Sequence, residues 1–200
     1  MEHADAHAHG PEDHVAAFER ARMGMWLFIG SEIMMFGAFI AAYVVLWTSA
    51  PGGEGTAFDK HHLSWKIACF NTAVLILSSF TMVKSVHAIS KGNRSKCEDY
   101  MIATAALGAL FLCVKGYEYS LKFADNIGPD TNVFYGCYFL MTGFHGLHVI
   151  GGIAFMAAIC AVISGRTRVP VERTVEVCAY YWHFVDVVWV AMFTTIYVIK

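Results

Sequence analysis

The sequence predicts an all-α membrane protein with five transmembrane helices, a cytoplasmic N-terminus and a C-terminus on the outer side. Two features of the composition support this fold class: 57% of the residues are hydrophobic, and only 15% are charged. Soluble domains of this length carry more charge and less apolar surface. The third observation is a series of long apolar stretches along the chain. Their bounds are 23–48, 66–88, 100–121, 134–163 and 177–199.

Each of these stretches is long enough to cross a bilayer as a helix. About 20 residues at ~1.5 Å per residue span the ~30 Å hydrocarbon core. The first stretch contains a single charged residue, Glu32, and the fourth has no Asp, Glu, Lys or Arg between Asp130 and Arg166. Buried helices of soluble proteins seldom reach such lengths five times in one chain. We therefore expect one five-helix transmembrane domain over residues 21–200.

The basic residues are distributed unevenly between the two ends of the predicted helices. Nine of them lie before the first helix or around the second and fourth connections, against four at the opposite ends. Because cytoplasmic loops are enriched in Lys and Arg, this bias predicts the orientation stated above. The larger group is Arg20, Arg22, Lys84, Lys91, Arg94, Lys96, Arg166, Arg168 and Arg173, and the smaller is Lys60, Lys66, Lys122 and Lys200.

The first twenty residues have a different composition. They are polar and acidic, and they contain His3, His7, His9 and His14 among Ala, Asp and Gly. They lack the basic start and apolar core of a signal peptide, and they are too acidic for a transit peptide. We expect a disordered cytoplasmic tail over residues 1–20. Metal buffering by its histidines is a weakly specified alternative.

Three histidines and one aspartate lie deep inside the fourth and fifth stretches. His145 and His148 are three residues apart, and so are His183 and Asp186. Residues at this spacing share one helix face, so His183 and Asp186 can satisfy each other or a common partner. A charged group at this depth costs about 2.5–3.5 kcal/mol and normally faces protein or an internal cavity. The two clusters therefore indicate a polar face that is turned toward protein.

Haem or copper ligation and a proton relay are the two functional hypotheses for these histidines. A membrane-spanning haem needs histidines on opposing helices, whereas His145 and His148 are neighbours on one helix. The sequence also lacks the carboxylate and histidine set with open positions that a dinuclear metal site requires. We therefore predict no metal ligand, no cofactor and no catalytic residue in this chain. The histidines are expected to hydrogen-bond across helices, with a subunit interface or a lipid headgroup as the alternative; close approach is expected at Gly143, Gly146, Gly151 and Gly152.

Two further ionisable sites lie in apolar surroundings. Glu32 is near the middle of the first stretch, where it is either a buried interhelical hydrogen-bonding group or a functional protonatable site. Lys115 and Glu118 are three residues apart in the third stretch. They are expected to form a structural ion pair that extends toward the outer interface. A small membrane transporter would use such groups too, but it predicts broken helices or related halves, and five helices without an internal repeat argue against both.

Five motifs occur in order from about residue 20 to the end of the sequence. They are Trp26…Ser31-Glu32…Phe36-Gly37, Asn71-Thr72…Ser78-Ser79, Glu118-Tyr119, Gly143-Phe144-His145-Gly146-Leu147-His148-Val149 and Tyr181-Trp182-His183-Phe184-Val185-Asp186-Val187-Val188-Trp189. Together they resemble subunit III of the haem–copper terminal oxidases, in its shorter, five-helix bacterial form. Only the acidic tail lies outside the resemblance.

The resemblance implies an accessory, non-redox subunit of cytochrome c oxidase, an enzyme that reduces O2 to water and pumps protons in aerobic respiration. The haems and copper are then carried by subunits I and II. The chain is expected to pack directly on subunit I, to contact subunit II and other oxidase subunits, and to hold phospholipid in a cleft that Glu32 faces. It is also expected to sustain proton uptake by subunit I and to protect the enzyme during turnover. The implied location is the bacterial cytoplasmic membrane; a respiratory supercomplex is left open, and nucleic acid is not an implied partner.

The sequence departs from the family pattern in two ways. The mitochondrial-type chain has seven helices, and this sequence matches from the third onward, so this chain alone cannot close the lipid cleft. Lys115 also stands where the family often has a neutral residue.

Quinol oxidases have a closely similar subunit III, and nitric oxide reductases have a related accessory subunit, so the electron donor stays open. The matches at Ser31-Glu32 and Gly143-Phe144-His145 favour the cytochrome c type.

Overall fold

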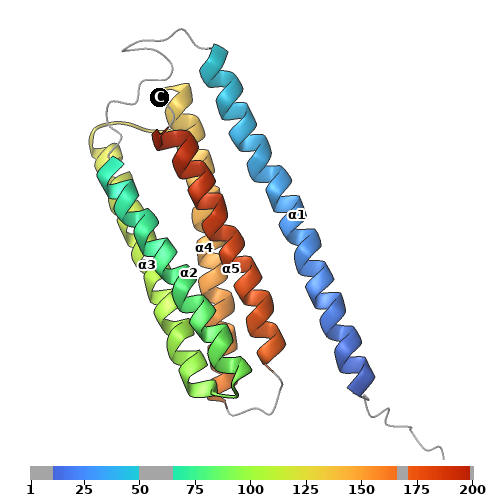
Figure 1. The fold of residues 1–200 in the computed structure, drawn as a ribbon. Helices are drawn as coiled ribbons and strands as arrows, with labels where there is room; N and C mark the ends of the chain where they lie inside the picture. The colour runs from blue at the N-terminus through green and yellow to red at the C-terminus, as the bar shows by residue number, and fades with distance from the viewer. Residues whose placement is uncertain (1–10, 50–64, 166–170, 199–200) are drawn as a thin grey trace, which may run out of the picture.

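The computed structural model describes residues 11–49, 65–165 and 171–198, and nearly all of them are helical. Five of the helices are long and apolar enough to cross a membrane, which confirms the predicted fold class (Figure 1). The helices are α1 (Pro11–Ser49), α2 (Trp65–Ser90), α3 (Arg94–Ala124), α4 (Val133–Ser164) and α5 (Glu172–Phe193), and the π-helix η1 (Thr194–Val198) continues α5.

The start of α1 differs from the expectation for the N-terminal tail. The helix begins at Pro11, so the structure is helical over the second half of the segment 1–20 that was expected to be disordered. Residues 1–10, with three of the four tail histidines, lie outside the described part. The boundary of the helical domain therefore moves toward the N-terminus.

The turn between α2 and α3 explains why α3 starts earlier than hydropathy predicted. Gly92 adopts a φ of 73°, a left-handed conformation that glycine reaches without strain. Asn93 then caps α3, because its side-chain oxygen accepts a hydrogen bond from the backbone N–H of Lys96 at 3.1 Å. The first turn of α3 is thus polar and capped, and it lies outside the apolar stretch that the hydropathy reading detects.

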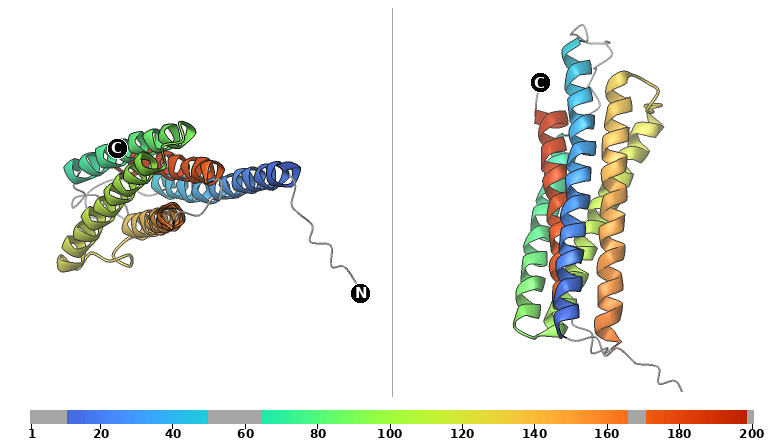
Figure 2. Two further views of the ribbon diagram at one scale, coloured as in Figure 1. Left: turned by 90° about the horizontal axis from the view of Figure 1, so that it is seen from below. Right: turned by 90° about the vertical axis from the view of Figure 1, so that its right-hand side faces the viewer.

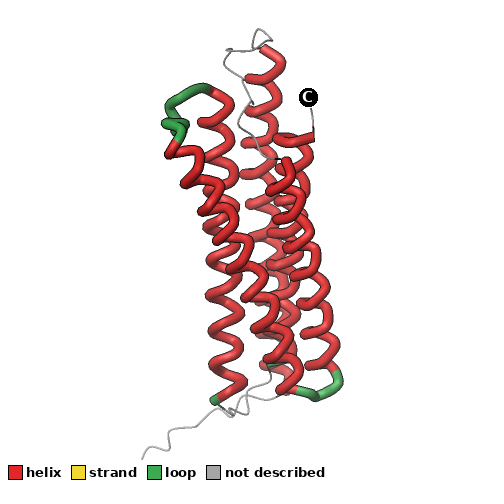
Figure 3. Tube along the Cα trace, turned by 90° about the vertical axis from the view of Figure 1, so that its left-hand side faces the viewer, coloured by secondary structure: helices red, strands yellow, loops and turns green. Residues whose placement is uncertain are grey.

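The last long helix, α5, lies at the centre of the bundle. It packs on α1, α2 and α4, and α3 completes the bundle by packing on α2 and α4. Seen along the bundle, α1 lies beside the group formed by the other four helices (Figure 2). Short loops join α2 to α3 and α3 to α4, and the start of α1 and the end of α5 lie at opposite ends of the bundle (Figure 3).

Trp182 of α5 joins α5 to three neighbouring helices. Its side chain is fully buried, and the indole Nε1 donates a hydrogen bond to Ser78 Oγ of α2 at 3.1 Å. The same ring lies against Gly108 of α3 and Gly152 of α4, where an added Cβ would come within 2.7 Å of ring carbons. Lipid chains are as apolar as these side chains, so close packing and interhelical hydrogen bonds must supply the association energy.

The glycines contribute to close packing less evenly than the sequence suggested. Gly151 lies against the Tyr181 hydroxyl and Gly152 against the Trp182 ring, both of α5, whereas a Cβ at Gly146 would make only an ordinary contact with Leu112. Gly143 faces open space, so the expected close approach there is wrong. The sequence analysis did not single out Gly108, because a single glycine in an apolar helix does not reveal which side chain lies against it.

Replacement of Gly152 tests this packing. Gly152→Ala is expected to lower the free energy of unfolding by about 1–3 kcal/mol, because the buried Trp182 ring has no space to accept a methyl group. Unfolding of the purified chain in detergent by heat or denaturant measures the change. The matched control is Gly143→Ala on the same helix, which should leave stability unchanged or slightly raised. Equal losses in both variants would contradict the packing described here.

Candidate functional site

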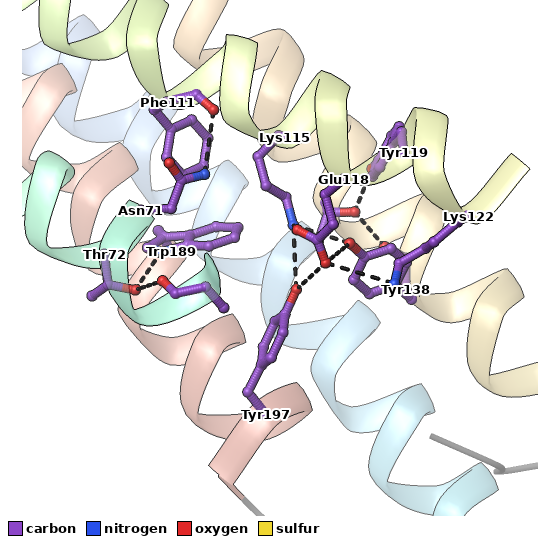
Figure 4. A network of polar contacts seen from close by, with 12 residues as sticks. Asn71, Thr72, Phe111, Lys115, Glu118, Tyr119, Lys122, Tyr138, Trp189 and Tyr197 are labelled. Carbon is purple, nitrogen blue, oxygen red and sulfur yellow. Dashed lines mark hydrogen bonds and ion pairs between the residues drawn. The ribbon is translucent and has the colours of Figure 1, made fainter. Parts of the chain in front are cut away.

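An ion-pair network lies inside the bundle near the C-terminal end of α3. Glu118 accepts a hydrogen bond from Lys115 Nζ through Oε2 at 2.8 Å, and its Oε1 lies 3.7 Å from Lys122 Nζ. All three side chains are less than a tenth exposed. The ion pair expected from the spacing of Lys115 and Glu118 is therefore present (Figure 4).

Two tyrosine hydroxyls connect this network to other helices. Tyr138 of α4 donates to Glu118 Oε1 at 2.9 Å and accepts from Lys115 Nζ at 3.0 Å. Tyr197, in the π-helix that follows α5, makes the same two contacts at 3.2 and 3.3 Å. The ammonium of Lys115 also lies 5.1 Å from the ring centroid of Trp189. The network thus joins α3, α4 and the end of α5, with both tyrosines pointing toward Glu118 (Figure 4).

The network corrects two expectations. Lys115 does not extend toward the outer interface, because its ammonium is held among tyrosines inside the bundle. Lys122 was counted among the basic residues at the outer ends of the helices, but it lies within α3 and is buried. Its spacing of four from Glu118 is the signal that would have revealed this second ion pair. With Lys122 removed from the count, the charge bias that predicts the orientation becomes stronger.

A second polar contact joins α1 to α4 near the middle of both spans. Glu32 Oε2 lies 3.1 Å from His148 Nε2, an ion-pair distance without hydrogen-bond geometry. The other ring nitrogen of His148 contacts the carbonyl oxygen of Phe144, one turn earlier, at 2.8 Å. Tyr181 of α5 donates a hydrogen bond to the backbone oxygen of His148 at 2.9 Å. Glu32 therefore sits where α1, α4 and α5 meet, and it does not stand alone in the apolar span.

His145 behaves differently from the other two histidines. It is completely buried, and neither ring nitrogen has a hydrogen-bond partner among the described residues. Its ring packs against Phe111 and Trp189, at centroid distances of 5.5 and 5.1 Å. The hydrogen bond across helices that was expected for His145 is absent. Within the described part of the chain, no three His, Cys, Asp or Glu residues are grouped so that they could hold a metal ion.

His183 and Asp186 share a helix face but do not bind each other. His183 Nδ1 forms a 2.8 Å hydrogen bond with Ser79 Oγ of α2. Asp186 is 8% exposed, and neither of its carboxyl oxygens has a hydrogen-bond partner in the described chain. Both side chains contribute to the wall of the same groove between α2 and α5. Of the two expectations, mutual satisfaction of His183 and Asp186 is wrong, whereas Ser79 is a polar neighbour that the two side chains share.

The sequence analysis missed a polar face of α2 that makes hydrogen bonds to α5 and α3. Thr72 accepts a hydrogen bond from Trp189 Nε1 at 3.0 Å. This bond lies about two helical turns along the same helix pair from the bond between Trp182 and Ser78. Asn71 donates to the carbonyl oxygen of Phe111 on α3 at 3.3 Å. The signal was the spacing of seven between polar pairs, which places them on one face of an apolar helix. These residues are Asn71, Thr72, Ser78 and Ser79.

Loss of the shared carboxylate should be the most damaging change in the ion-pair network. Glu118→Gln removes the carboxylate that two buried ammonium groups share, and it is expected to lower the free energy of unfolding by about 3–5 kcal/mol. Chemical unfolding in detergent measures this loss. The exposed Glu172→Gln should cost less than about 1 kcal/mol. The double variant Lys115→Met/Glu118→Gln should be less destabilised than Glu118→Gln alone, and strictly additive losses would refute the network.

The Glu32–His148 contact predicts a difference between two replacements. Glu32→Gln keeps the size and one acceptor oxygen, so stability should fall by less than about 1 kcal/mol. Glu32→Leu leaves His148 Nε2 without a polar partner in the bundle, at an expected cost of about 1–3 kcal/mol. The same unfolding measurement separates the two. An equal loss of stability in Glu32→Gln and Glu32→Leu would contradict this prediction. It would mean that the contact depends on the charge of the carboxylate rather than on its size and its acceptor oxygen.

Comparison with known proteins identifies the family. The model of the family described as Cytochrome c oxidase subunit III matches residues 4–200. A probable cytochrome c oxidase subunit 3 of Nocardia farcinica is 36% identical over 89% of this chain and 87% of its own length. A probable cytochrome c oxidase subunit 3 of Rickettsia bellii is 34% identical over 88% of this chain and 68% of its own length. Cytochrome bo(3) ubiquinol oxidase subunit 3 of Pseudomonas aeruginosa is 31% identical over 97% of this chain and 93% of its own length. Five membrane-spanning helices and a match along almost the whole sequence place the chain in the cytochrome c oxidase subunit III family.

Proposed function

We propose that this chain is an accessory, non-redox subunit of a proton-pumping haem–copper oxidase, and that it stabilises the assembled enzyme. The main support for the proposal is that the polar groups inside the bundle bind one another and so connect its helices. Lys115, Glu118 and Lys122 bind each other and the hydroxyls of two helices, and the tryptophans of α5 bind hydroxyls of α2. Such groups hold a bundle together, which is the property that an accessory membrane subunit needs.

The partners follow from the same proposal. Subunits I and II would carry the haems and copper, and this chain would pack directly on subunit I in a bacterial cytoplasmic membrane. Support comes from α1, which packs on α5 and α4 along one side and exposes large apolar residues such as Leu27 and Met34 on the other. That surface suits lipid or further helices. The proposal also includes a phospholipid bound near Glu32. It further includes a role of this chain in sustaining proton uptake by subunit I.

The electron donor of the complex is proposed to be cytochrome c. The motifs around Glu32 and His145 favour it, and relatives from several organisms are named cytochrome c oxidase subunit 3. The relative named as part of a ubiquinol oxidase keeps quinol as the second candidate. Turnover of the purified complex with reduced cytochrome c, compared with turnover with ubiquinol, distinguishes them.

Removal of this chain from the purified complex tests the accessory role. Initial O2 consumption should stay near that of the intact enzyme, because no redox centre is removed, while activity should be lost faster during sustained turnover. Adding back the chain should restore the lifetime. The isolated chain should also contain no stoichiometric haem, copper or iron by metal analysis and visible spectroscopy. Complete loss of initial activity, or a Soret band that belongs to the isolated chain, would contradict the proposal.

A further inference from the structure

A groove of about 700 Å3 runs between α2 and α5, with Ile40 of α1 at its edge. Most of its wall is apolar, and side chains such as Ile76 and Val187 are more than half exposed. A second hollow of about 480 Å3 shares His183 with the groove and continues along the same two helices as far as Glu176. From Glu176 to Thr195 the seam follows α5 for about 28 Å at ~1.5 Å per residue, close to the ~30 Å thickness of the hydrocarbon core.

Asp186 lies in the wall of this groove, near the middle of the α5 span. It is more than nine-tenths buried, and both carboxyl oxygens lack a hydrogen-bond partner in the described chain. Ser79 is a polar neighbour of the carboxyl, but it makes no hydrogen bond of good geometry to either carboxyl oxygen, and its hydroxyl shares a hydrogen bond with His183. A carboxyl at mid-membrane depth without a partner is costly, and such groups normally meet a donor from protein.

The threonine hydroxyls of the groove cannot supply that donor. Thr72 donates to the carbonyl oxygen of Ala68 at 2.8 Å, one turn earlier in α2. Thr194 and Thr195 donate in the same way to Val190 and Ala191 of α5, at 2.9 and 2.8 Å. Each hydroxyl has a single proton, so these threonines offer only acceptor lone pairs to an occupant. The threonines therefore have no hydrogen to offer Asp186, and the ring of His183 is bonded through Nδ1 to Ser79 rather than to the carboxyl. A donor for the carboxyl has to come from the occupant of the groove.

We propose that the groove receives one transmembrane helix of a partner subunit, and that a donor side chain of this helix binds Asp186 at mid-membrane depth. The donor is an ammonium, guanidinium, amide or hydroxyl group. The carboxyl oxygens are covered in the isolated chain, so a rotation of the Asp186 side chain brings them to the occupant. The inference rests on the proposed function, because it requires that the chain be one subunit of a membrane complex.

Other occupants fit the observations less well. Acyl chains carry no donors, and the headgroups of bilayer lipids lie about 15 Å from the mid-plane, half the hydrocarbon thickness. A second copy of this chain that used the same groove would bring a second unpartnered Asp186 carboxyl and the same threonine acceptors to the contact. A helix matches both the length of the seam and the need for a donor at one depth. The π-helix that begins at Thr194 lies at the end of the groove, and such segments occur often at functional sites.

Photo-cross-linking in the assembled complex tests the proposal. A photoreactive amino acid is placed at Val187 or at Ile76, irradiated in native membranes, and its adducts are located by mass spectrometry at residue level. Both probes are expected to attach to the same membrane-spanning segment of one partner subunit, within one helical turn of a donor side chain. The matched control is the same probe at Ile150 on α4, half exposed and outside the groove, which should not attach to that segment.

Variants then test the role of the carboxyl. Asp186→Leu should lower the cross-link yield from Ile76 by about tenfold or more, because a charge-assisted hydrogen bond is lost. Asp186→Asn, which keeps one acceptor, should give an intermediate yield. Thr194→Val, which keeps the shape of an exposed side chain, should give a smaller loss and remains informative if the Asp186 variants fail to assemble. Asp99→Asn, an exposed carboxylate outside the groove, should change nothing.

The proposal is wrong if the probes label only lipid, a small hydrophobic molecule, a second copy of this chain, or a segment without a donor near the contact. It is also wrong if Asp186→Leu assembles and keeps the full cross-link yield. Haem that co-purifies with this chain is measured in the same samples. Haem together with lipid-only adducts overturns the inference and leaves the proposed function intact, whereas a complex without haem overturns the proposed function itself.

Discussion

A polar side chain in the hydrocarbon region must find its partner within protein, and most of this structure follows from that constraint. Water cannot satisfy a carboxylate or an ammonium at this depth, so the bundle places Glu118 between two lysines and two tyrosines. The same constraint sets the rotation of α5, whose indole N–H groups must reach hydroxyls of α2. The apolar residues then fill the space between these contacts, and the polar pairs determine which faces meet.

The features that could be predicted from the sequence are those that depend on one helix at a time. Length and composition decide whether a segment can cross a bilayer, so all five helices were predictable. The Lys115–Glu118 pair was predictable because its spacing needs no knowledge of the neighbouring helices. The isolation of His145 and the lack of a bond between His183 and Asp186 could not be predicted. Both depend on how α4 and α5 are rotated against α2 and α3, which no local pattern records.

Errors at the helix ends have a different physical origin. Hydropathy detects the segment that lies in lipid, whereas a helix continues as far as its backbone hydrogen bonds and caps allow. The cap at Asn93 extends α3 beyond its apolar part. Lys122 was counted as a charge at a helix end because it directly follows the apolar stretch 100–121. Its partner, Glu118, is on the same helix and makes burial of both possible.

The central position of α5 has a consequence for how the protein is made. A ribosome delivers α1 to α4 to the membrane before α5, so the bonds that hydroxyls of α2 and the carboxylate of α3 make with two tryptophans and Tyr197 form last. Until then the bundle lacks the helix that packs on α1, α2 and α4, and the close contacts of the Trp182 ring with Gly108 and Gly152 cannot form. The early intermediate is thus a natural substrate for insertion factors and membrane proteases. Completion of translation, and not insertion of the first helices, is the step that commits this chain to a stable bundle.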